Sequence, residues 1–151
     1  MLNKLLVLVL LLTFCIGKSF SKEIIVQSDR LEINKEEGIS RFIGNVYANE
    51  PSMKIWSEEL VINLDVKLEV ITKLIANKNV KLEREEIVAE STKAIYLVED
   101  EKLELYGNVI VTENGNILRG DKFVLDLKDS SSIMRAENSS RVKAVIINKT
   151  E

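Results

Sequence analysis

The sequence contains no histidine, and its one cysteine, Cys15, lies in an apolar stretch near the N-terminus. Histidine is the usual general base of enzymes, and cysteine thiolates serve as nucleophiles and metal ligands. The six glycines are scattered, so no glycine-rich phosphate-binding loop is present. The many carboxylates, such as Glu58 and Glu104, mostly occupy the outward half of an alternating pattern, as solvated charges do. The sequence therefore predicts a protein that is not an enzyme, with no catalytic residue, no metal site and no cofactor.

Long apolar runs are also scarce, because the only one covers residues 5–16. This run is shorter than the roughly 20 residues that a membrane-spanning helix needs. Lys4 precedes it, and Ser19 and Ser21 supply small residues at the positions that determine cleavage. We therefore expect residues 1–21 to be a cleavable signal peptide and the protein to be exported to the periplasm.

The expected mature chain, residues 22–151, is long enough to form one domain with a hydrophobic core. Removing Lys4 and Lys18 with the leader leaves 19 basic residues against 24 acidic ones, a net charge of −5. Nucleic acids favour strongly positive surfaces, so we expect no nucleic-acid partner. The absence of cysteine from this part means that packing alone must hold the fold together.

One short pattern recurs along the chain at nearly constant spacing. Its second half, a small or polar residue followed by Asn-Val, is centred on Asn45, Asn79 and Asn108. The first half of the next copy follows each asparagine at the same interval, because 57−45, 91−79 and 120−108 all equal 12. The distance from the start of a copy to its asparagine is 17 residues in the first and third copies (45−28 and 108−91). In the middle copy this distance is 22 residues (79−57), so that copy carries five extra residues. Repeats of this kind indicate stacked supersecondary units that share one core. The first halves start at Ser28, Ser57, Ser91 and Gly120.

Apolar and polar residues alternate with a period of two in nearly every segment. Leu103, Leu105 and Val109 fall on one face, for example, and Glu104 and Asn108 fall on the other. This period is typical of strands with one buried face. Asn-Gly at 114–115 predicts a tight hairpin, and the only proline, Pro51, lies in another expected turn. The pattern predicts an all-β antiparallel meander of eight or nine strands, rolled or stacked into two facing layers.

The repeat resembles the OstA-like domain, which is shared by the lipopolysaccharide transport proteins LptA and LptC and by the N-terminal part of LptD. The resemblance spans about residues 23–148, although the second copy has Lys78 where the other two have glycine. It implies a single twisted antiparallel β-jellyroll, open at both ends, with an apolar interior that accepts lipopolysaccharide acyl chains. The matching segments are Ser28-Asp29-Arg30-Leu31, Phe42-Ile43-Gly44-Asn45-Val46, Leu105-Tyr106-Gly107-Asn108-Val109, Gly120-Asp121-Lys122-Phe123 and Arg141-Val142-Lys143-Ala144-Val145-Ile146.

A lipid carrier must cover acyl chains, because each exposed methylene costs about 0.8 kcal/mol in water. The inward positions of the expected strands supply aliphatic side chains for this purpose, since only 5% of the residues are aromatic. The same positions would also fill an ordinary dry sandwich core. The lipid-binding residues that we expect are Leu31, Ile33, Phe42, Val46, Leu60, Ile62, Val80, Leu82, Tyr96, Leu105, Val109, Phe123 and Leu125.

An unclosed sheet leaves backbone groups unpaired on its first and last strands, and strand addition at such edges is a common mode of recognition. We expect residues 23–33 and 142–147 to dock edge to edge with LptC-like and LptD-like proteins, or with further copies in a head-to-tail homo-oligomer. The length and leader favour an LptA-like bridge that carries lipopolysaccharide from the inner to the outer membrane. Two alternatives are an LptC-like inner-membrane component that retains its N-terminus and an exported structural β-repeat module without ligand.

Overall fold

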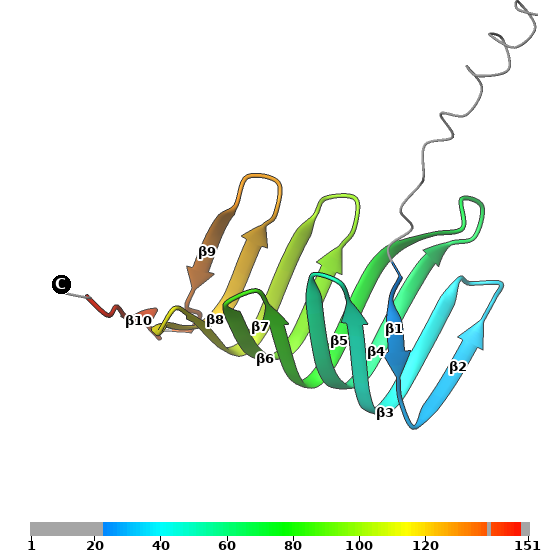
Figure 1. Ribbon diagram of the computed structural model, residues 1–151, viewed down its shortest axis with the longest axis horizontal. Helices are drawn as coiled ribbons and strands as arrows, with labels where there is room; N and C mark the ends of the chain where they lie inside the picture. The colour runs from blue at the N-terminus through cyan, green and yellow to red at the C-terminus, as the bar shows by residue number, and fades with distance from the viewer. Residues whose placement is uncertain (1–22, 139, 149–151) are drawn as a thin grey trace, which may run out of the picture.

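The computed structural model describes residues 23–138 and 140–148, and this part of the chain forms one antiparallel β-sheet of ten strands (Figure 1). The expected signal peptide lies outside the described residues. The all-β fold predicted from the alternation is confirmed, as a twisted, open-ended jellyroll. The strands are β1 (Ile25–Gln27), β2 (Arg30–Asn34), β3 (Ile39–Glu50), β4 (Met53–Asp65), β5 (Val70–Arg84), β6 (Ile87–Leu97), β7 (Lys102–Glu113), β8 (Asn116–Asp126), β9 (Ser131–Arg135) and β10 (Lys143–Val145).

The strands occupy eight positions across the sheet, because the first and the last position each hold two short strands. β3 to β8 are long and pair in chain order. β1 pairs with the end of β3 and β2 with its beginning. At the other edge, β9 pairs with the end of β8 and β10 with its beginning. The sequence predicted eight or nine strands, and the described residues form ten, because two of the eight positions are interrupted where the sheet bends.

The sheet bends along a line of β-bulges, which the Asn-Val halves of the repeat supply. The pairing shifts register at this line between every two neighbouring long strands. Gly44 has a φ of 82° and Asn45 a φ of 46°, and both angles lie in the left-handed region that glycine and asparagine tolerate best. A Cβ on Gly44 would also lie 2.5 Å from a carboxylate oxygen of Asp29, so the Asp29 side chain would have to move to accommodate any other residue. The third copy, Gly107-Asn108, has the same conformation.

The bend divides the sheet into two arms that face each other. The first arm contains β2 and β9 and the strand halves that meet in the turns at 35–38, 66–69, 98–101 and 127–130. The second arm contains β1 and β10 and the halves that meet in the turns at 51–52, 85–86 and 114–115. In Figure 1 the bends lie along the bottom and the turns of the first arm reach the top, so the arms diverge away from the bend line.

The constant interval between each asparagine and the next first half reflects a pairing between the two halves of the repeat. Val46 lies opposite Ser57, Val80 opposite Ser91, and Val109 opposite Gly120. Large and small side chains therefore alternate in the sharpest part of the bend. The hydroxyls of the serines donate to backbone carbonyls two residues further on, from Ser57 to Glu59 and from Ser91 to Lys93.

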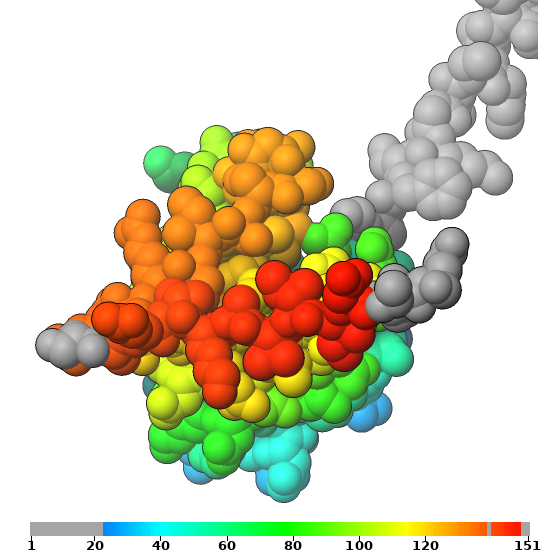
Figure 2. All heavy atoms as spheres, turned by 90° about the vertical axis from the view of Figure 1, so that its left-hand side faces the viewer, coloured from blue at the N-terminus to red at the C-terminus, as the bar shows by residue number. Residues whose placement is uncertain are grey.

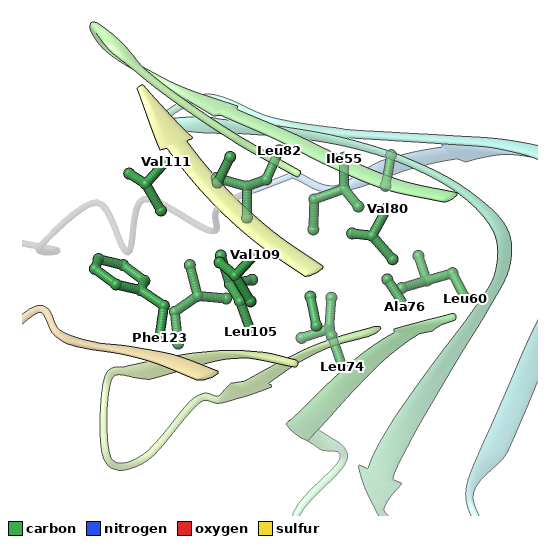
Figure 3. Packing of buried hydrophobic residues seen from close by; sticks show 14 of the residues in the cluster. Ile55, Leu60, Leu74, Ala76, Val80, Leu82, Leu105, Val109, Val111 and Phe123 are labelled. Atoms are coloured by element: carbon green, nitrogen blue, oxygen red, sulfur yellow. The ribbon is translucent and has the colours of Figure 1, made fainter. Parts of the chain in front are cut away.

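The core lies between the arms and consists of aliphatic rows that run across the sheet. Figure 3 shows Ile55 and Leu82 of the second arm pointing toward Leu74, Leu105 and Phe123 of the first. The predicted inward faces are confirmed by these rows. In the first arm one row is Leu31, Phe42, Leu60, Ala76, Ala94, Leu105, Phe123 and Met134. In the second arm the row is Val26, Ala48, Ile55, Leu82, Ala89, Val111, Leu118 and Ala144.

The turns at 51–52 and 114–115 lie where the sequence predicted them. Asn114 and Gly115 connect β7 to β8 with φ angles of 51° and 85°, as a two-residue hairpin loop requires. Pro51 lies between β3 and β4, outside the hydrogen-bonded ladder.

The two edges of the sheet include the segments 23–33 and 142–147 that we expected there, and also β9, which we did not expect at an edge. β1 and β2 form one edge, and β9 and β10 form the other. Figure 2 shows the C-terminal residues, in orange and red, laid across one end of the molecule. Asp121 fixes this segment, because its carboxylate accepts hydrogen bonds of 2.6 Å from the Glu137 amide and from the Ser140 hydroxyl.

Candidate functional site

An apolar cavity of about 200 Å³ lies between the arms, away from the bend and in the N-terminal half of the jellyroll. The arms diverge here, and Ala48 is smaller than its neighbours in the row, Val26 and Ile55. Except for Glu50, its lining is aliphatic, aromatic or thioether in character. The lining residues are Ile24, Ala48, Glu50, Met53, Ile55, Ile71, Leu74, Tyr96 and Val98.

A second hollow of about 310 Å³ adjoins the cavity and shares Glu50, Met53, Tyr96 and Val98 with it. This hollow is polar, since Arg84 and Glu101 also line it. Tyr96 stands at the boundary between the two. Burial raises the pKa of the Tyr96 phenol, and the negative charges of Glu101 and Glu50 raise it further, while Arg84 opposes them. The phenol is therefore neutral across the physiological range.

The arrangement is amphipathic, with an apolar floor between the arms and a charged mouth at the divergent side. Such a site can take an aliphatic chain into the floor while its polar end stays in the mouth. Among residues 23–138 and 140–148, no group of three or more acidic or thiol side chains could hold a metal ion. Within the same residues, no helix is long and apolar enough to cross a membrane.

The thirteen predicted lipid-binding residues fall into three groups. Seven are buried in the packed core: Val46, Leu60, Val80, Leu82, Leu105, Val109 and Phe123. Phe42, Ile62, Tyr96 and Leu125 are partly buried and pack against that core. Leu31 and Ile33 are exposed on β2 at the N-terminal edge. Of all thirteen, only Tyr96 lines the apolar cavity.

The sequence missed most of the cavity wall, which includes Ala48, Met53, Ile55, Ile71 and Leu74. Alternation identifies the inward face of a strand but not how far each inward residue lies from the bend. Residues next to the bend fill the narrow part of the interior, whereas residues near the turns line the wide part. Distance from the bend would have been a useful signal for part of the wall, since Met53, Ile71 and Tyr96 lie well away from it along their strands.

Comparison with solved structures shows the same fold in a protein of known role. The chain superposes with a TM-score of 0.75 on LptH from Pseudomonas aeruginosa, which is the LptA-homologous periplasmic component of a conserved lipopolysaccharide transport device. The two chains share 21% sequence identity, and the match covers 84% of this chain and 96% of LptH. A search of curated proteins found no match.

The sequence itself matches a family model over residues 25–131, which is most of the chain from β1 to the beginning of β9. The matched span contains all three bulges, the paired repeat halves and the complete lining of the cavity except Ile24. The resemblance stated from the repeat is thus confirmed. The chain belongs to the family of the LptA/(LptD N-terminal domain) LPS transport protein.

Proposed function

We propose that this protein is a periplasmic bridge that binds lipopolysaccharide and carries it between the inner and the outer membrane. The family is a transport family, and the structural match to LptH supports a periplasmic role. The observation that carries the proposal is the apolar cavity between two diverging arms, because a packed sandwich without ligand has no need of it.

The shape of the site supports acyl chains as the ligand. Its floor is aliphatic and holds about 200 Å³, enough for part of one chain. Each methylene that moves from water into such a floor gains about 0.8 kcal/mol. The polar mouth with Arg84 and the neutral Tyr96 phenol can face the headgroup side of the lipid. A site of this size grips only a fraction of a multi-acyl lipid, which suits a carrier that must release it.

A photocrosslinking experiment tests the proposal with a matched pair of tyrosines. Tyr96 lines the cavity, whereas Tyr106 lies on the outer face of the same arm, with its ring under the Lys122 ammonium at 4.6 Å. Each is replaced in turn by p-benzoyl-phenylalanine, and the full-length protein is expressed with its leader in a lipopolysaccharide-producing cell. Irradiation should attach lipopolysaccharide to the variant at 96 and not to the variant at 106.

Equal labelling at both positions, or none at 96, would contradict lipid binding in the cavity and would favour a structural module without ligand. Native mass spectrometry after detergent-free purification provides an independent readout of bound glycolipid. The mass of the mature chain separates the two transport roles, because an LptC-like component would retain residues 1–21 and a periplasmic bridge would lose them.

We further propose that both edges of the sheet dock with partners. β1 and β2 would accept an LptC-like protein or a preceding copy, and β10 would accept an LptD-like protein or a following copy. The exposure of Ile25 and Val145 on these edges supports this role, since an apolar edge strand is prone to strand addition.

A further inference from the structure

The hairpin formed by β4 and β5 departs from the repeat, because it carries the five extra residues of the middle copy. In the first arm, β4 runs from Glu59 to Asp65 and β5 from Val70 to Asn77 before the bend, whereas β6 pairs only over Lys93–Leu97. An additional irregularity between Asn63 and Leu64 accommodates the insertion. At about 3.3 Å per residue, two extra residues lengthen β4 by about 7 Å relative to β6. The hairpin is thus the longest of the first arm among the described residues.

The added tip is apolar and exposed. Leu64, Val66, Leu68 and Val70 are 38%, 51%, 71% and 49% exposed. Scattered single aliphatic residues on a surface are ordinary, but four within seven residues form a patch that needs an explanation.

The tip is also well braced, so its exposure is not a sign of a loose loop. The Asp65 carboxylate accepts hydrogen bonds from the backbone amides of Lys67 and Leu68, at 2.8 and 2.9 Å. The Leu64 amide donates to the carbonyl of Gly38 in the neighbouring turn, at 2.7 Å. A γ-methyl of Val66 stands so close to Gly38 that a Cβ there would lie 2.9 Å away. These contacts hold the apolar tip in one place beside the N-terminal end of the jellyroll.

The tip adjoins the wall of the cavity through Leu64. Leu74, which is 6% exposed, and Ile71 both line the cavity. Leu64 lies directly opposite Ile71 in the register, so the two side chains share the inner face of the arm. Exposure therefore rises stepwise along one apolar strip, from the buried floor at Leu74 through Leu64 to the tip at Leu68.

We propose that the β4–β5 tip, residues 64–70, is a lip that receives the acyl chain of an incoming lipid and guides it sideways into the cavity. This inference rests on the proposed lipid-carrier function and adds the route of loading. An aliphatic chain is the occupant that the strip favours, because its exposed residues are leucine and valine and because it leads into an aliphatic floor. The charged residues of the tip, Asp65, Lys67 and Glu69, nearly balance, so the tip offers little electrostatic attraction to a charged partner.

The test compares loading rates with equilibrium affinity in the mature protein. The probe is an environment-sensitive fluorescent fatty acid, presented free in solution and from phosphatidylcholine vesicles. The double variant V66S/L68S removes apolar surface from the lip, and Ile133→Ser, at a residue of β9 that is 51% exposed and lies outside the proposed docking segments, is the control. Far-ultraviolet circular dichroism and the unfolding midpoint verify that all variants are folded.

We expect V66S/L68S to lower the association and dissociation rates by about fivefold, because contacts made only during passage affect the barrier. Its dissociation constant should stay within about twofold of the unmodified protein, and Ile133→Ser should leave both rates unchanged. Unchanged rates in V66S/L68S would overturn the lip while leaving the carrier function intact. A weaker affinity with an unchanged association rate would also overturn it, since the tip would then belong to the final binding site. If the unmodified protein bound no probe at all, the proposed function itself would fail.

Discussion

The side-chain amide of Asn45 donates a hydrogen bond of 2.8 Å to the carboxylate of Asp29, and this bond joins the first bend of the sheet to the second. The same relationship recurs one repeat later, where the Asn79 amide donates to the Glu58 carboxylate. In both pairs the acceptor, Asp29 or Glu58, is the second residue in the first half of a repeat. The donor is the asparagine of the bulge on the neighbouring strand. In these two strand pairs the bends are therefore linked along the fold line.

The bend in β5 contains a correctable strain, because Lys78 occupies the position that glycine holds in the other two Asn-Val copies. Lys78 has a φ of 63°, in the left-handed region that costs most residues about 1–2 kcal/mol. Lys78→Gly should therefore stabilise the protein, by about 0.5–1 kcal/mol after the added flexibility of glycine is subtracted. Lys73→Gly, within the regular part of β5, should destabilise it by a similar amount. Urea unfolding measures both, and a loss of stability in Lys78→Gly would contradict this account of the bend.

Much of the fold could be predicted from the sequence, because the repeat encodes its own pairing. The residues from Asn45 to Ser57, for example, lead from a bulge through the turn at 51–52 and back to the bend. The constant interval therefore corresponds to one complete hairpin of the second arm. Alternation then determined which side chains face inward. The interruption of the first and last strand positions was not predicted. In the first position the inward residues Val26 and Leu31 are five apart, so the alternation changes phase where Ser28 and Asp29 lie at the fold line.

The candidate site was harder to predict, because it depends on the angle between the arms. Leu60 and Tyr96 are both inward residues of the first arm, yet Leu60 is completely buried near the bend while Tyr96 lines the cavity. Alternation does not distinguish the two, whereas their places in the repeat do, since Leu60 follows Ser57 by three residues and Tyr96 follows Ser91 by five. In the sequence the lip is recognisable only as an insertion of five residues. The pairing of Leu64 with Ile71 is what places its apolar residues beside the cavity.

Leucines near the bend and at the lip should differ sharply in their effect on stability. Leu60 is 0% exposed, so Leu60→Ala should leave a cavity and lower the free energy of unfolding by about 2–5 kcal/mol. Leu68→Ala removes the same atoms from the exposed tip and should change it by less than about 0.5 kcal/mol. Chemical denaturation of the two variants provides the comparison. Similar losses in both would mean that the tip packs against the core and is not available to a lipid.

A substitution that fills the cavity should abolish ligand binding while leaving the stability of the protein nearly unchanged. Ala48 lines the cavity, so Ala48→Leu can place its added carbons in existing space and should change stability by less than about 1 kcal/mol. Ala94 is equally buried but does not line the cavity, and Ala94→Leu should cost about 1–3 kcal/mol through overpacking. Binding of the fluorescent fatty acid should be lost in Ala48→Leu. Retained binding in a stable Ala48→Leu protein would show that the ligand lies elsewhere.

The attachment of the C-terminal segment should depend on pH through Asp121. The hydrogen bond from the Ser140 hydroxyl, with that from the Glu137 amide, lowers the pKa of the Asp121 carboxyl. A carboxylate whose folded-state pKa is lowered adds stability above its ordinary pKa and loses it as the pH falls through the lowered value. Ser140→Ala should therefore raise the pKa of Asp121, so that the segment loosens at a higher pH.

An NMR titration of the carboxyl groups measures this shift, and Asp129 serves as an internal control. Its pKa is lowered by a hydrogen bond from Ser131 and should not respond to Ser140→Ala. If the titration of Asp121 stayed in place while the segment loosened, the carboxylate would not be the attachment point.

Association of copies through the C-terminal edge should be sensitive to proline in β10. Successive N–H groups of a strand point to opposite sides, so the N–H groups of Ala144 and Val145 face different sides of β10. Proline at one of these positions removes a donor from the free edge, and proline at the other disturbs the pairing with β8. Whichever proline faces outward should abolish head-to-tail oligomers and leave the monomer folded, because β10 contributes only three residue pairs to the sheet. Val145→Ala, which keeps the N–H group, should still associate. Sedimentation velocity and chemical crosslinking measure the assemblies, and oligomers that persisted in both proline variants would place the docking edge elsewhere.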